Sequence, residues 1–119
     1  MPNKNYVSGR NFEYRIVKWL VNRGYYVVRS YASKGVFDLV ATPPRSSKLS
    51  GTLLIQAKYS RSGKVKISSE EKTRLATASR RYKAKSVIAY NEGRKLKWML
   101  VNPYYYVRGK KLHRQDNIS

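Results

Sequence analysis

Two short runs of strand-forming residues carry polar groups where a buried strand would have none. The first run, residues 36–41, contains Asp38, and the second, residues 52–58, contains Gln56 and Lys58. Burying a carboxylate or an ammonium without a partner is costly, so such groups usually persist where a metal, a substrate or one another compensates them. Side chains alternate between the faces of a strand, so Gln56 and Lys58 share one face of theirs. The pattern predicts a functional site that spans two neighbouring strands.

Hydrolysis of a phosphodiester with the help of a divalent metal ion fits these side chains. Mg²⁺ binds oxygen ligands and needs only one or two carboxylates, because it keeps several of its waters. The metal lowers the pKa of a bound water, and a lysine can orient the nucleophile or offset charge in the transition state. Asp38, Gln56 and Lys58 supply these parts, and Glu13 adds a carboxylate from a preceding helix. The set predicts a metal-dependent nuclease.

The helix that would carry Glu13 begins at residue 8 or 9 and ends near Gly24, its C-terminal glycine. Apolar side chains at helical spacing predict the face that packs on the core: Phe12, Ile16, Trp19 and Leu20. Glu13 lies at the edge of this stripe. A surface ion pair with Arg10 or Arg15 is therefore an alternative to a role in the site.

The remaining elements place the two polar-bearing runs in a sheet. Strands are expected at residues 25–30, 36–41 and 52–58, a helix from the capping box Ser68-x-x-Glu71 to Tyr82 or Lys83, and strands at 86–90 and 95–101. The first two strands would form an antiparallel hairpin, and residues 91–93 would form the turn between the last two. This order predicts an α/β fold, a sandwich with a mixed five-stranded sheet flanked by helices.

The charge of the chain points to a polyanionic partner. It has 26 Lys and Arg against 6 Asp and Glu in 119 residues, a formal net charge of +20. Loops at about 42–51 and 60–66 are basic and suited to phosphate contact, whereas the basic side of the second helix could also be a solvated face. The candidate DNA-binding residues are Arg10, Arg29, Lys34, Arg45, Lys48, Arg61, Lys64, Lys66, Lys72 and Arg74.

Length and composition predict one intracellular domain over residues 1–119, with a polar tail at about 109–119. There is no Cys, which excludes disulfides and thiolate metal sites, and the lone His113 lies in the tail. No apolar run is long enough to span a membrane, and no signal segment is evident at the N-terminus. We expect the cytoplasm or nucleoid, or the host cytoplasm if the protein is viral, and no membrane partner.

Five short motifs occur in order through the first half of the chain. They are Gly9-x-x-x-Glu13, Gly24-Tyr25-x-Val27-Val28-Arg29, Ala32-Ser33, Asp38-Leu39-Val40-Ala41 and Leu54-Ile55-Gln56-Ala57-Lys58. In this order and spacing they resemble the PD-(D/E)xK nuclease superfamily, and within it the archaeal Holliday junction resolvases. The later half is similar only in its helix-strand-strand pattern.

The resemblance implies a restriction-endonuclease-like core and a role for each matching position. Asp38 would be the main metal ligand, the backbone carbonyl of Ala57 would add a further oxygen, and Lys58 would be the catalytic lysine. Glu13 would act near the metal or its waters, and Ser33 would contact the site or the scissile strand. The metal would be Mg²⁺ or Mn²⁺, with no small-molecule cofactor besides it.

Gln56 departs from the family pattern, because the family has a ligand Glu there. Its amide oxygen can still bind a metal, although without charge, and certain restriction-type nucleases of the superfamily use Gln-x-Lys. A Gln at this position is equally compatible with a replacement that disables the site.

The resemblance also implies a homodimer that cuts four-way DNA junctions at paired positions. Two active sites on a two-fold axis suit a junction of two-fold symmetry. The apolar candidates for the dimer contact are residues 104–107 and the edge near Trp98. Two alternatives stay open: a related endonuclease that acts on duplex, flap or nicked DNA, and a non-catalytic basic protein that binds nucleic acid.

Overall fold

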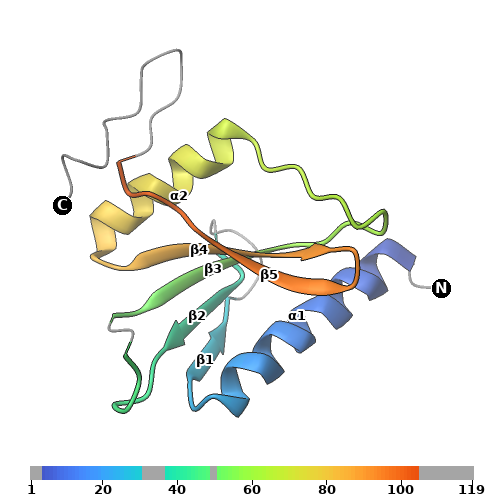
Figure 1. Ribbon diagram of the computed structural model, residues 1–119. Helices are drawn as coiled ribbons and strands as arrows, with labels where there is room; N and C mark the ends of the chain where they lie inside the picture. The colour runs from blue at the N-terminus through green and yellow to red at the C-terminus, as the bar shows by residue number, and fades with distance from the viewer. Residues whose placement is uncertain (1–3, 31–36, 49–50, 105–119) are drawn as a thin grey trace.

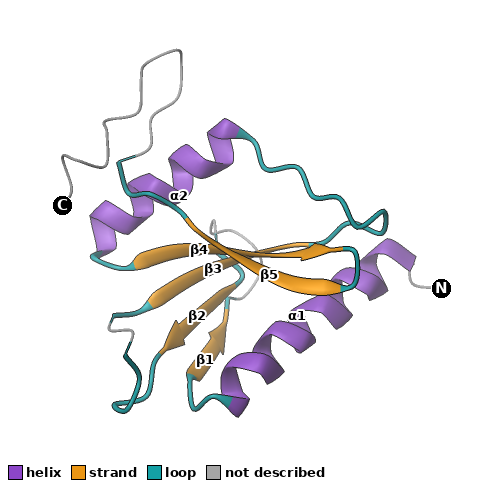
Figure 2. Ribbon diagram, viewed as in Figure 1, coloured by secondary structure: helices purple, strands orange, loops and turns teal. Residues whose placement is uncertain are grey.

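The computed structural model describes residues 4–30, 37–48 and 51–104 of the chain (Figure 1). In chain order, its elements are α1 (Lys4–Asn22), β1 (Tyr26–Arg29), β2 (Leu39–Thr42), β3 (Leu53–Lys58), α2 (Ser69–Tyr82), β4 (Lys85–Glu92) and β5 (Lys95–Leu100). The predicted mixed five-stranded α/β fold is confirmed, with one described helix on each face of the sheet (Figure 2). No helix in the described part of the chain is long and apolar enough to cross a membrane.

The strands lie in the sheet in sequence order, β1-β2-β3-β4-β5. Neighbours are antiparallel except β3 and β4, which are parallel and are connected through α2. The predicted antiparallel pairing of the first two strands is confirmed. Leu39 pairs with Ile55, and the Asp38 amide donates to the Ile55 carbonyl at 2.8 Å. This register brings Asp38, which immediately precedes β2, opposite the end of β3.

The helix α1 covers one face of the sheet. Phe12, Ile16 and Leu20 are buried, and they pack with strand residues Leu39, Ala41, Leu53, Ile55, Val87 and Ala89. Trp19, predicted for the same stripe, is only partly buried, and its ring centroid lies 5.0 Å from that of Trp98 in β5. The first helix and the last strand are therefore in direct contact.

The helix α2 covers the opposite face. Leu75 and Ala76 form a second cluster with Ile88 and Val101. A buried chain of hydroxyls also fixes α2 on β4, because Ser86 Oγ donates to the Leu75 carbonyl at 2.7 Å and receives a hydrogen bond from Ser79.

The capping signals of α2 were predicted correctly. Ser68 is the N-cap, its Oγ accepts from the Glu71 amide at 3.1 Å, and the Glu71 side chain returns to the Ser68 backbone. The helix ends at Tyr82, and the C-cap Lys83 takes the left-handed conformation with φ of 52°.

Three predicted boundaries show the largest differences from the structure. Helix α1 begins at Lys4, about one turn before the predicted start, and β2 begins at Leu39, so Asp38 precedes the strand. Strand β4 continues to Glu92, and only residues 93–94 form the turn to β5. The prediction failed at β4 because Asn91 is a favoured turn residue, yet here it is buried and pairs with Leu96.

Candidate active site

The candidate site lies at the C-terminal end of β3, where the strand residues are less buried than at its start. Leu53, Leu54 and Ile55 are buried, whereas the next three residues, Gln56, Ala57 and Lys58, are only partly so. Leu53 and Ile55 pack in the α1 cluster, so Gln56 and Lys58, at the alternate positions, share the face that looks toward α2. The end of β3 therefore carries two polar side chains that are only partly buried.

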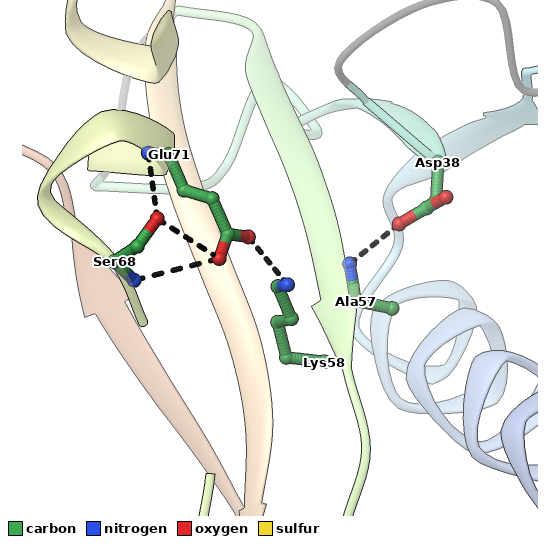
Figure 3. A network of polar contacts seen from close by, with 5 residues as sticks. All are labelled: Asp38, Ala57, Lys58, Ser68 and Glu71. Carbon is green, nitrogen blue, oxygen red and sulfur yellow. Dashed lines mark hydrogen bonds and ion pairs between the residues drawn. The ribbon is translucent and has the colours of Figure 1, made fainter. Parts of the chain in front are cut away.

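The carboxylate of Asp38 is held against the end of β3. Its Oδ2 accepts a hydrogen bond from the Ala57 amide at 2.7 Å (Figure 3). Burial raises the pKa of Asp38 most; the Ala57 hydrogen bond opposes this, the charge of Glu13 adds to it, and Lys58 opposes it. Among the described residues, the positive charge near ionised Asp38 therefore does not offset the effect of burial.

Glu13 belongs to the same electrostatic neighbourhood but has a different partner from those predicted. Its Oε1 accepts a hydrogen bond from Arg29 of β1 at 2.8 Å, so neither Arg10 nor Arg15 is its ion-pair partner. The pairing crosses from α1 to β1, which sequence spacing along one helix could not indicate. Arg29, predicted to bind DNA, is engaged by this carboxylate.

Lys58 contacts a carboxylate that the sequence analysis did not place in the site. Its Nζ forms an ion pair with Oε2 of Glu71, in the first turn of α2 (Figure 3). Burial opposes ionisation of Glu71, but hydrogen bonds from Lys58 and Ser68 outweigh it and lower the pKa of Glu71. The capping box already explained an acid at this position, so no further sequence signal pointed to Lys58.

The residues at the site fit a hard divalent cation with few protein ligands. Gln56 Oε1 is buried and has no hydrogen-bond partner among the described residues, which leaves an oxygen suited to a metal. Within the described residues, no three or more His, Cys, Asp or Glu gather into a metal cluster. Asp38, Gln56 and the Ala57 carbonyl would therefore share the ion with water molecules, as Mg²⁺ tolerates.

The segment that follows Lys58, predicted as a basic loop at residues 60–66, is tied to the β4–β5 hairpin by hydrogen bonds. Asn91 accepts a hydrogen bond from the Ser60 amide at 2.8 Å and donates to the Ser60 carbonyl at 2.7 Å. The Gly93 amide donates to the Gly63 carbonyl at 3.0 Å. Gly63 has φ of +81°, and a Cβ there would lie 2.8 Å from the Gly93 Cα, so the approach requires glycine.

A cavity of about 400 Å³ lies between the start of α1 and the segment that follows Lys58. Gly9 at the start of α1 lines it together with the residues after Lys58: Tyr59, Ser60, Arg61 and Ser62. The Tyr59 ring packs on Phe12 with centroids 5.4 Å apart. Tyr59 follows Lys58 in the chain, and the lining of the hollow includes hydroxyl, aromatic and cationic groups.

The predicted DNA-binding residues fall into separate regions. Arg61, Lys64 and Lys66 are exposed on the segment after β3; Arg74 is exposed and Lys72 half-buried on α2, and Arg10 is exposed on α1. Arg45 and Lys48 lie beyond the other end of β2 and β3, where Pro44 approaches Gly24. Strand β3, about 17 Å long at 3.3 Å per residue, separates that end of the sheet from Lys58. Ser33 and Lys34 lie outside the described residues.

Comparisons with known proteins show the family and the fold of the chain. The family model "Archaeal holliday junction resolvase (hjc)" matches residues 4–119. A solved structure of Hjc from Archaeoglobus fulgidus, titled a Holliday junction resolvase from an archaeal hyperthermophile, superposes with a TM-score of 0.59 at 23% identity, covering 87% of this chain and 80% of that one. Among curated proteins, no significant match was found. Because the family model matches nearly its whole length, the chain belongs to the archaeal Holliday junction resolvase (Hjc) family.

Proposed function

We propose that this nuclease resolves four-way DNA junctions by metal-dependent hydrolysis of phosphodiesters, as a homodimer. The observation that carries the proposal is that Asp38, Gln56 and Lys58 all belong to the end of β3, in a chain of the Hjc family. The Ala57 amide donates a hydrogen bond to the Asp38 carboxylate, and the buried side-chain oxygen of Gln56 has no hydrogen-bond partner among the described residues. These two oxygens and the nearby ammonium are the parts that the chemistry needs.

Each site residue has a distinct part in this proposal. Asp38 and Gln56, with the Ala57 carbonyl, would hold Mg²⁺ or Mn²⁺, which when bound supplies a Lewis acid at the scissile phosphate and a more acidic water. Lys58 would offset the negative charge that grows on the phosphate oxygens. Glu13, already paired with Arg29, would act on waters in the outer shell of the site rather than as a direct ligand.

The basic segment after Lys58 supplies the phosphate contacts nearest to the site. Arg61, Lys64 and Lys66 are exposed there, and the clamp from Asn91 fixes where the segment starts. Arg45 and Lys48, at the far end of the sheet, would contact a different part of the substrate.

A cleavage assay with three substrates tests the proposal. The chain is incubated with Mg²⁺ and, separately, with Mn²⁺, on a four-way junction, a linear duplex of the same sequence and a nicked duplex. Paired incisions in the junction alone support the proposal. Equal cutting of the duplex or nicked DNA would indicate a related endonuclease, and tight junction binding with no cutting would indicate a non-catalytic binding protein.

A further inference from the structure

Two ion pairs neutralise described charged neighbours of Asp38, and no described cation forms an ion pair with Asp38 itself. Within the described residues, Glu13 pairs with Arg29 and Lys58 pairs with Glu71, and no described cation is within ion-pair distance of Asp38. A partly buried carboxylate in this state attracts a cation. The charge pattern of the site therefore depends on where Lys58 is held.

Lys58 is the side chain best placed to compete with a metal for Asp38. Its charge already acts on the Asp38 carboxylate through space. Asp38 lies opposite the end of β3, and Lys58 is the last residue of that strand, on a flexible four-carbon stem. In Figure 3 the ammonium points toward Glu71, while Asp38 lies on the other side of the β3 backbone.

We propose that Glu71 is a positioning residue that holds the Lys58 ammonium toward α2 and so keeps Asp38 open to the metal ion. This inference rests on the proposed function, because it concerns the metal and the lysine of that site. It assigns to the first turn of α2 a part in catalysis beyond capping the helix.

The two oxygens of Glu71 divide these tasks. Oε1 accepts from the Ser68 amide at 3.4 Å and from the Ser68 hydroxyl at 3.3 Å, while Oε2 takes the Lys58 ammonium. Glutamine also serves in a capping box, but its amide would offer Lys58 no charge. The substitution Glu71→Gln therefore removes the ion pair and keeps the cap.

The anchoring of α2 makes Glu71 a fixed partner rather than a mobile one. The Glu71 side chain is only 14% exposed and that of Lys58 30% exposed. One turn further along the helix, Leu75 is buried against the sheet and its carbonyl is bonded to Ser86 of β4. Strand β4 pairs with β3 residue by residue up to Lys58, which couples the helix to the lysine through the sheet.

The neighbouring Glu70 offers a matched control. It lies in the same first turn of α2 and is exposed, so Glu70→Gln makes the same change in net charge and helix-end charge. A loss seen with Glu71→Gln and not with Glu70→Gln therefore comes from the Lys58 contact. Lys58→Met, which keeps the length of the stem, completes the set alone and combined with Glu71→Gln.

The test measures Mn²⁺ binding to the full chain without DNA, by electron paramagnetic resonance, and then the Mg²⁺ dependence of junction cleavage. We expect Glu71→Gln to weaken Mn²⁺ binding several-fold and to raise the Mg²⁺ needed for half-maximal cleavage, with the KM for junction unchanged from that of Glu70→Gln. In the Lys58→Met background, Glu71→Gln should lose most of its effect on Mn²⁺ binding.

Each other result overturns the inference. Unchanged Mn²⁺ binding in Glu71→Gln would leave Glu71 as a cap alone, and an undiminished loss in the Lys58→Met background would make it a direct ligand. If the parent binds Mn²⁺ in this Glu71-dependent manner but cuts no DNA, the proposed function fails and the inference stands. If the parent cuts junctions and Glu71→Gln equals it in both measurements, the inference fails and the function stands.

Discussion

Asp38 is the residue on which both the chemistry and the electrostatics of the site depend. Burial raises its pKa, so the folded chain holds the Asp38 proton more tightly than the unfolded chain does. Stability attributable to this group is therefore greatest below the unfolded pKa of about 3.9 and falls as pH rises toward the raised value. At neutral pH the ionised carboxylate costs stability until a cation compensates it.

Replacing Asp38 by Asn should separate binding, cleavage and stability. We expect Asp38→Asn to cut junctions at least about 100-fold more slowly but to bind them as the parent does, because the basic side chains hold the DNA. Without metal, the variant should melt higher than the parent at pH 7 and lose this advantage near pH 3. Added Mg²⁺ should raise the melting temperature of the parent alone.

The exposed acid Glu92 provides the control for this prediction. Glu92→Gln makes the same change in charge at the end of β4, away from Asp38 in the chain. Parent-like cleavage by Asp38→Asn would contradict its assignment as a metal ligand.

Gln56 should remain a metal ligand through its side-chain oxygen. A neutral ligand holds a hard cation less tightly than a carboxylate does, so Gln56→Glu should lower the Mg²⁺ needed for half-maximal cleavage. Gln56→Ala should raise that requirement or abolish activity, and Mn²⁺ should support the parent better than Mg²⁺ does. Cleavage titrations with each metal measure this.

Two results would contradict this view of Gln56. Gln56→Ala that cuts as well as the parent at limiting Mg²⁺ would show that the side chain is not a ligand. A parent that is inert with every metal, next to an active Gln56→Glu, would show that Gln56 disables the site.

For single residues, the sequence predicted the candidates for the site but not their partners. Asp38, Gln56 and Lys58 were identifiable because polar groups interrupt apolar strand patterns. The ion pair of Glu71 with Lys58 was not, because it joins a helix start to a strand end through the path of the chain between them. The capping box gave Glu71 a sufficient local reason to be acidic, which concealed its second contact.

The elements were predicted well wherever a local rule fixes them. The capping box defined the start of α2, and the alternating and helical apolar patterns found all five strands and both described helices. The errors arose where a tertiary contact overrides local preference. Asn91, which favours turns, stays in β4 because the Ser60 backbone satisfies its side chain.

The Asn91 clamp should matter for the stability of the site's wall. Asn91→Ala leaves the amide and carbonyl of Ser60 without these partners, which should cost about 1–3 kcal/mol of unfolding free energy. We also expect weaker junction binding, since the basic segment after Lys58 is no longer fixed at Ser60. Urea denaturation and a binding titration measure both effects.

The exposed Asn22 at the end of α1 gives a chemically identical control substitution. Asn22→Ala should change the unfolding free energy by a few tenths of a kcal/mol at most. If Asn91→Ala were equally mild, the segment would not depend on the clamp.

For the whole molecule, the charge of +20 should dominate the affinity for DNA. Neutralising about 6–10 phosphates would reduce the association constant about 10³–10⁵-fold between 50 and 200 mM salt. Arg61→Ala should make the slope of log affinity against log salt less steep by about 1, the effect of losing one phosphate contact. An almost flat dependence, measured by fluorescence anisotropy on a labelled junction, would exclude phosphate contact as the main term.

The chain should be a homodimer in solution and on a junction. Paired incisions need two sites at a fixed separation, which a monomer does not provide. Light scattering of the free protein and of its junction complex gives the mass directly, and a monomer in both states would favour a nuclease that acts at one site.

The described residues predicted for the dimer contact differ in how far the fold buries them. Trp98 lies on the edge strand β5 and is partly buried against Trp19 and the α1 cluster, whereas Leu100 of the same strand is exposed. Tyr104 is exposed, and residues 105–107 lie outside the described part. Sequence could identify these apolar residues but not which of them the folded core would take, since that depends on how the last strand meets the first helix.

The single parallel pairing in the sheet has a consequence for when the enzyme becomes competent during folding. Strand β3 meets β4 only after the intervening helix has closed a long loop: Leu53 pairs with Lys85, and the loop entropy must be lost before those contacts form. The position of Asp38 depends on the antiparallel pairing of β2 with β3. The position of Glu71 depends on the connection through α2 to β4. A nascent or half-folded chain would thus carry its full basic charge and bind DNA before it could cut it.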